Sequence, residues 1–122
     1  MTVQAISRWP DPQRGIALAA RALILRTFQG STEAFERGRA VYRVSGVPMI
    51  ALSSDVKSVE LHIMSATRLY DPFNVTRIGP GGTKTVSLNS GSDVRSPALI
   101  WVLTAARLEC HTNSSFLTAM AR

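Results

Sequence analysis

The chain has few of the residues that build metal sites, disulfides or nucleophilic centres. Cys110 is its one cysteine, and His62 and His111 are its two histidines. A single cysteine cannot close a disulfide within the chain. Cys110 and His111 are adjacent, so their side chains point apart on a helix or a strand and make a poor chelating pair. We therefore predict no metal site, no cofactor and a reduced thiol.

Acidic residues and lysines are also scarce. Asp and Glu together number 8 against 14 basic residues, of which only Lys57 and Lys84 are lysines, and the formal net charge is +6. Charged residues make up 18% and hydrophobic residues 45%, whereas about 25% of a typical globular protein is charged. Arginine pairs bidentately with phosphates and carboxylates, so this composition favours an anionic partner. Codon composition is the alternative source of the arginine excess.

Long apolar runs are absent as well. A membrane-spanning helix needs roughly 18 consecutive apolar residues, but Arg21 and Arg26 interrupt the first apolar block, and Arg107 and Glu109 end the last one. The first twelve residues lack the apolar stretch of a signal peptide. We expect a cytoplasmic protein, with peripheral contact at a membrane as the alternative.

The N-terminal part of the chain predicts an arm followed by a helix. A chain of 122 residues fits one domain, 1–122. Pro10 and Pro12 disfavour helix around them and predict an extended arm over 1–12. Residues 13–28 are rich in alanine, leucine and arginine, which predicts a helix that stops near Gly30.

This helix has no clean polar side. Leu18 and Leu25 fall on the face opposite its main apolar stripe, beside Arg14 and Arg21. Either the helix is buried with its arginine heads reaching solvent, or its second face meets another subunit or a membrane. We predict Leu18, Leu25 and Trp101 as residues of an oligomer interface.

The middle of the chain predicts strands. A short helix is expected first, from Ser31 or Thr32 to Gly38. From about residue 39 to 90 the residues become β-branched and aromatic, with turn sequences between the runs. Val59, Leu61 and Ile63 alternate with Ser58, Glu60 and His62, which predicts a strand buried on one side.

Two further patterns complete the fold. The glycine-rich run at 79–82 predicts a hairpin between 74–78 and 83–89, and its spacing differs from that of a phosphate-binding loop. Ser96 and Pro97 predict an N-cap and first helical residue, with a strand at 100–103 as the alternative and a last helical turn at 116–120. The expected class is α+β: an antiparallel sheet at about 39–90 flanked by an N-terminal helix and C-terminal helical segments.

Arginines are the candidate functional residues. Arg68 and Arg77 flank Tyr70 and Phe73, an arrangement that pairs phosphate contacts with rings that stack on bases. The alternative interpretation is that the arginines are solubilising charges at strand edges. The predicted anion-binding residues are Arg14, Arg21, Arg37, Arg39, Arg43, Arg68 and Arg77.

These observations favour a non-enzymatic assembly or binding protein. It would form a homo-oligomer through apolar helix faces and present arginines to RNA or to an acidic membrane surface. Small viral and phage structural or accessory proteins share this size and charge, an analogy at the level of composition. One alternative is a small enzyme whose site at a subunit interface uses His62, Cys110 or Glu60 for proton transfer. Another is an adaptor that binds a partner strand at a long sheet edge.

Overall fold

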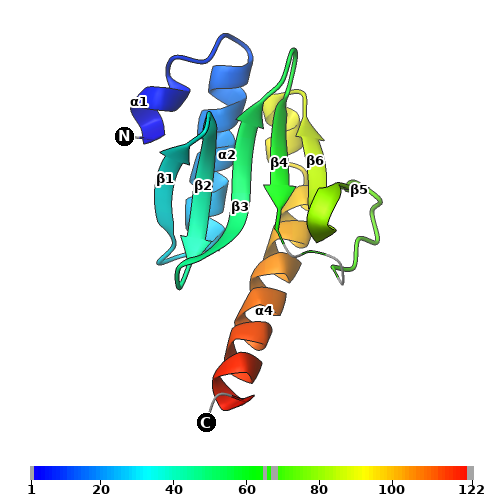
Figure 1. Cartoon of the computed structure of the whole chain (residues 1–122). Coiled ribbons are helices and arrows are strands. Elements are labelled where there is room, and N and C mark those ends of the chain that lie inside the picture. Colours follow the sequence, from blue (N-terminus) through cyan, green and yellow to red (C-terminus); the bar gives the residue numbers. More distant parts are fainter. Residues whose placement is uncertain (1, 65, 67–68, 121–122) are drawn as a thin grey trace.

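One antiparallel sheet, packed against two long helices, forms the body of the protein (Figure 1). The computed structural model describes residues 2–64, 66 and 69–120, with side chains as far as residue 109. The strand order is β1-β2-β3-β4-β6-β5. The strands are β1 (Thr32–Glu36), β2 (Arg39–Val44), β3 (Val47–Ser54), β4 (Val59–Ile63), β5 (Arg77–Ile78) and β6 (Lys84–Leu88).

The helices pack on one face of this sheet. The longer ones are α2 (Gln13–Thr27) and α4 (Pro97–Met120). In the view of Figure 1, α2 and the first part of α4 lie behind the strands, and the rest of α4 extends beyond the sheet. Two short helices, α1 (Thr2–Ile6) and α3 (Gly91–Val94), and a 3-10 turn at Pro80–Gly82 complete the described elements. This arrangement confirms the predicted α+β class.

The core lies between the sheet and α2 and α4. Alternate residues of each strand point toward the helices, as the two-residue period of a strand requires. The prediction for β4 is confirmed on its apolar side, because Val59, Leu61 and Ile63 are buried. Its other side was expected to be solvent-exposed, but Ser58 and Glu60 are also buried. The largest side chains that are almost fully buried are Tyr42, Ile6, Ile24, Ile50, Leu52, Leu61, Ile63, Leu88, Leu99, Leu103, Val59 and Val102.

The helix predicted from Ser31 or Thr32 to Gly38 is wrong, because this segment forms β1 and its turn. β1 pairs with β2 from Thr32↔Arg43 to Glu36↔Arg39. The reversal needs left-handed backbone at both Arg37 (φ 53) and Gly38 (φ 78), which matches the twist of a hairpin. The acidic residues that suggested a helix start, Glu33 and Glu36, form ion pairs with arginines instead. The sheet therefore includes β1 and begins at Thr32 rather than at about residue 39.

The extended arm predicted over 1–12 is also wrong in its first half. Thr2–Ile6 form α1, and Ile6 has no exposed surface because it belongs to the core. The prolines act only locally: helix ends before Trp9 and resumes at Gln13. Burial of Ile6 therefore holds this segment against the domain.

The remaining helix and hairpin predictions are confirmed. α2 matches the predicted helix, and α4 begins at Pro97 with the Leu99 amide donating to Ser96 Oγ at 3.1 Å. The expected last turn belongs to α4, which continues to Met120. β5 pairs with β6 as the predicted hairpin, although only two residues of β5 are strand.

Candidate binding site on the uncovered sheet face

The sheet has a second face that the helices do not cover. Within the part of the chain that the structure describes, no helix or strand crosses this face (Figure 1). Residues that alternate with the core positions point toward it. We call it the open face, and its central residues are Arg39, Val41, Ala51, Ser53, Glu60, His62, Arg77, Thr85 and Ser87. They are mostly polar, so the open face is the candidate site.

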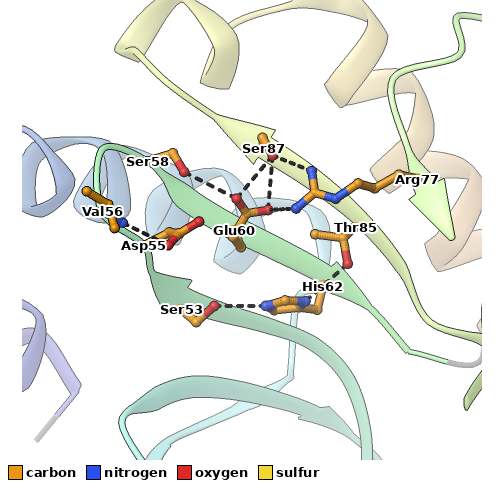
Figure 2. A network of polar contacts seen from close by, with 9 residues as sticks. All are labelled: Ser53, Asp55, Val56, Ser58, Glu60, His62, Arg77, Thr85 and Ser87. Atoms are coloured by element: carbon orange, nitrogen blue, oxygen red, sulfur yellow. Dashed lines mark hydrogen bonds and ion pairs between the residues drawn. The ribbon is translucent and has the colours of Figure 1, made fainter. Parts of the chain in front are cut away.

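Glu60 is the centre of a hydrogen-bond network on this face (Figure 2). Glu60 is only 8% exposed. Ser58 donates to Oε1 at 3.2 Å, the Ser87 hydroxyl lies 3.1 and 3.0 Å from the two carboxylate oxygens, and Arg77 Nη2 donates to Oε2 at 2.6 Å. Arg77 also donates to Ser87 Oγ. The carboxylate is therefore neutralised by Arg77 and saturated with donors.

His62 lies two residues further along β4 and bridges two hydroxyl groups (Figure 2). Ser53 Oγ is 2.8 Å from its Nε2, and Thr85 Oγ1 is 3.2 Å from its Nδ1. A neutral imidazole has one donor and one acceptor nitrogen, so each hydroxyl takes the complementary role. Burial lowers the pKa of His62, and the nearby positive charges of Arg39 and Arg77 lower it further against the opposing effect of Glu60.

Arg39 lies on the open face and forms no ion pair with the residues that the structure describes. The register Ala40↔Leu52 places it level with Ser53 on the adjacent strand. Among the described residues, no carboxylate lies within ion-pair distance of its guanidinium. Its charge acts on His62, because it contributes to the lowered pKa of that ring.

The structure separates the predicted arginines into two groups. Four form ion pairs: Arg14 with Asp11, Arg21 with Glu33, Arg43 with Glu36 and Arg77 with Glu60. Arg37 and Arg39 form none with the described residues, and Arg68 lies outside them. Of the predicted arginines that the structure describes, the two without an ion pair therefore lie at or next to the β1–β2 turn.

The predicted interface residues also differ from one another. Leu18 and Leu25 are half-buried and pack against the core of their own chain. Trp101 is 39% exposed, and its ring centroid lies 6.0 Å from those of Tyr70 and Phe73, both of which are exposed. These three rings form an aromatic cluster at the surface. Tyr70 and Phe73, which the sequence suggested as base-stacking rings beside arginines, therefore pack against Trp101 of α4.

Two of the three predicted proton-transfer groups share the open face. Glu60 and His62 are neighbours there, whereas the Cys110 side chain lies outside the described ones. Sequence reasoning missed Ser53, whose position across from β4 depends on the register of β3. Strand alternation alone indicates which side of the strand Ser53 lies on, but it does not indicate which residue of the adjacent strand Ser53 contacts.

This pair is poorly arranged for acyl transfer. A nucleophilic serine needs a base whose imidazolium form is stabilised, and a carboxylate usually orients that ring. Here the Nδ1 partner is the Thr85 hydroxyl, and positive charges oppose protonation of His62. Central strands also engage their backbone amides in the ladder, so they leave none for an oxyanion. Among the described residues, no group of three His, Cys, Asp or Glu side chains suits a metal ion.

The outer strands of the sheet are β1, which has five residues, and β5, which has two. None of the helices described combines the length and the hydropathy of a membrane span.

Comparisons with protein-family models, with curated proteins and with solved structures return no match to this chain.

Proposed function

We propose that this protein is a non-enzymatic assembly and binding protein that self-associates and binds RNA through the cationic end of its open face. The supporting observation is the grouping of Arg37, Arg39 and Lys57. The β1–β2 turn and the β3–β4 loop lie at the same end of the sheet, as the pairings Ala40↔Leu52 and Ser54↔Val59 require. None of the three cations has a carboxylate partner among the described residues.

Negative charge at this end is small. Glu36 is matched by Arg43 at 2.8 Å, and Asp55 accepts a hydrogen bond from the backbone amide of Val56. Three cations therefore face one unpaired carboxylate. A cluster of this kind supplies the sequence-independent phosphate contacts that dominate nucleic-acid affinity.

The surroundings of these cations favour RNA over a membrane. Hydroxyl and imidazole groups of Ser53 and His62 adjoin Arg39 on the open face. Val56 is the one strongly exposed large apolar side chain in the turn and loop that carry the cations. Adsorption to a bilayer draws on apolar area as well as charge, and one valine supplies little of it.

The double variant Arg37→Gln/Arg39→Gln is expected to bind a single-stranded oligouridylate more weakly at low salt, because two phosphate contacts are lost. The slope of log affinity against log salt should become shallower by about 1.4. Fluorescence anisotropy over a salt series measures both quantities. Arg26→Gln is the matched control, since Arg26 is exposed near the other end of α2 and has no ion pair in the described part of the chain.

Equal affinity for parent and double variant would contradict the proposal. So would binding to phosphatidylserine vesicles, with the same dependence on Arg37 and Arg39, by a protein that does not bind the oligonucleotide. That second result would support the membrane alternative.

Self-association is expected to depend on the aromatic cluster of Tyr70, Phe73 and Trp101. These rings expose apolar area at one place on the surface, and burying aromatic side chains is a strong source of interface energy. Trp101→Arg should therefore shift the assembly toward monomer in sedimentation velocity. Val47→Arg is the control, since it adds the same charge at an exposed valine far from this cluster in the chain. A parent that sediments as a monomer at every concentration would remove self-association from the proposal.

A further inference from the structure

Three polar residues of the open face occupy neighbouring positions on three adjacent strands. Arg39 comes from β2, Ser53 from β3 and His62 from β4. Register places Arg39 level with Ser53, and Ser53 Oγ lies 2.8 Å from His62 Nε2. The three residues therefore present a guanidinium, a hydroxyl and an imidazole side by side.

We propose that Arg39, Ser53 and His62 form a binding site for one phosphate group, and that His62 takes up a proton when the phosphate binds. This inference rests on the proposed function, because it locates one of the phosphate contacts of the bound RNA. The proposed function requires only a general attraction between cations and RNA. This inference adds one defined phosphate site and the protonation of His62.

The charges around His62 explain why the site selects an anion. Glu60 on β4 is already bound to Arg77 on β5 at 2.6 Å. The residues opposite His62 on β3 and β6 are Ala51 and Thr85, and neither is charged. Ser53, which reaches the ring diagonally from β3, is also uncharged. Arg39 on β2 is the remaining charge that faces the ring, and no described carboxylate balances it. An anion next to Arg39 would compensate this charge.

The hydrogen bonds of His62 allow a proton to be gained without loss of a partner. In the neutral ring with hydrogen on Nδ1, the imidazole donates to Thr85 and accepts from the Ser53 hydroxyl at Nε2. When a proton from solvent binds to Nε2, this nitrogen becomes the donor and Ser53 Oγ the acceptor. The hydroxyl hydrogen of Ser53 is then free to turn toward the phosphate. Arg39 supplies the charged donors, which pair well with tetrahedral oxyanions.

The test uses sulfate as the probe, because sulfate is a tetrahedral dianion whose own charge does not change between mildly acidic and neutral pH. Histidine ring signals are followed by NMR in the full chain during pH titrations with sulfate and with chloride at equal ionic strength. We expect sulfate to raise the pKa of His62. Its affinity should increase as the pH falls, by up to about tenfold per pH unit where one proton is taken up with the anion.

Arg39→Gln is expected to abolish the effect of sulfate on His62, whereas Arg26→Gln should preserve it. An identical His62 titration in sulfate and chloride would overturn the inference, and this measurement needs no variant. If that result accompanied oligouridylate binding that still depends on Arg37 and Arg39, the inference would fail while the proposed function stood. Failure of the parent to bind either sulfate or the oligonucleotide would overturn both.

Discussion

Glu60→Ala is expected to lower the free energy of unfolding by about 2–3 kcal/mol. Its side chain is 11% exposed and accepts from Arg77, Ser58 and Ser87. Removing a buried charged acceptor costs more than an average hydrogen bond, because its former donors lose their partner in a place that water reaches poorly. Urea denaturation of parent and variant, followed by circular dichroism, measures the difference.

Glu36→Ala is the matched control for this prediction. Glu36 forms the same kind of ion pair on the same sheet, with Arg43 at 2.8 Å, but its side chain is 45% exposed. Solvent screens an exposed pair, and its contribution to stability is small. A loss for Glu36→Ala as large as that for Glu60→Ala would show that burial of the Glu60 network has no energetic consequence.

The Glu60 network also shows what a single sequence can predict about this site. Alternation along residues 58–63 correctly placed Glu60 and His62 on one side of a strand, because side-chain direction on a strand has a fixed period, and Ser58 lies just before that strand. Ser87 and Arg77 are 27 and 17 positions from Glu60 in the chain. Their contact depends on the register of β6 against β4 and β5, which the turn sequences left undetermined.

The ion pairs of the arginines likewise depend on contacts that the sequence alone does not determine. The composition gives a net charge of +6 but does not distinguish between the predicted arginines. Arg21 is neutralised by Glu33, which comes from β1 rather than from its own helix. Such pairings follow from how α2 packs beside the sheet, so the availability of Arg37 and Arg39 could be recognised only in the folded chain.

The β1 segment shows where local signals misled. A polar residue followed by glutamates at 33 and 36 is typical of a helix start. The same spacing suits a strand in which Phe35 packs near Trp9, with ring centroids 6.2 Å apart, and the glutamates bind arginines. Five residues carry too little intrinsic helix preference to resist pairing with β2.

Stability is expected to fall as the pH decreases below about 6.5, and His62 is the cause. Its folded pKa lies below the ordinary value of 6.5. Between these two values the unfolded chain binds the proton and the folded chain does not, so acidification favours unfolding. The slope reaches at most about 1.4 kcal/mol per pH unit for one such group. Above the ordinary value both states are neutral at this ring, and His62 adds no pH dependence.

The acidic groups with lowered pKa act in a separate window. Hydrogen bonds from Thr76 help to lower the pKa of Asp71 below 3.8, and Arg43 lowers that of Glu36 below 4.5. Their stabilising effect is lost only as the pH falls below those ordinary values. The range between about pH 5 and 6.5 therefore separates the effect of His62 from that of these acidic groups.

His62→Gln should flatten the dependence of stability on pH in that range, because glutamine can hydrogen-bond to a neighbouring hydroxyl but does not titrate. Urea denaturation of the parent and of this variant across the range measures the slopes. Equal slopes would show that the positive charge of Arg39 and the burial of the ring do not act on His62 in solution. Since an anion beside Arg39 would relieve the repulsion, sulfate should flatten the slope of the parent toward that of the variant, with chloride at equal ionic strength as the reference.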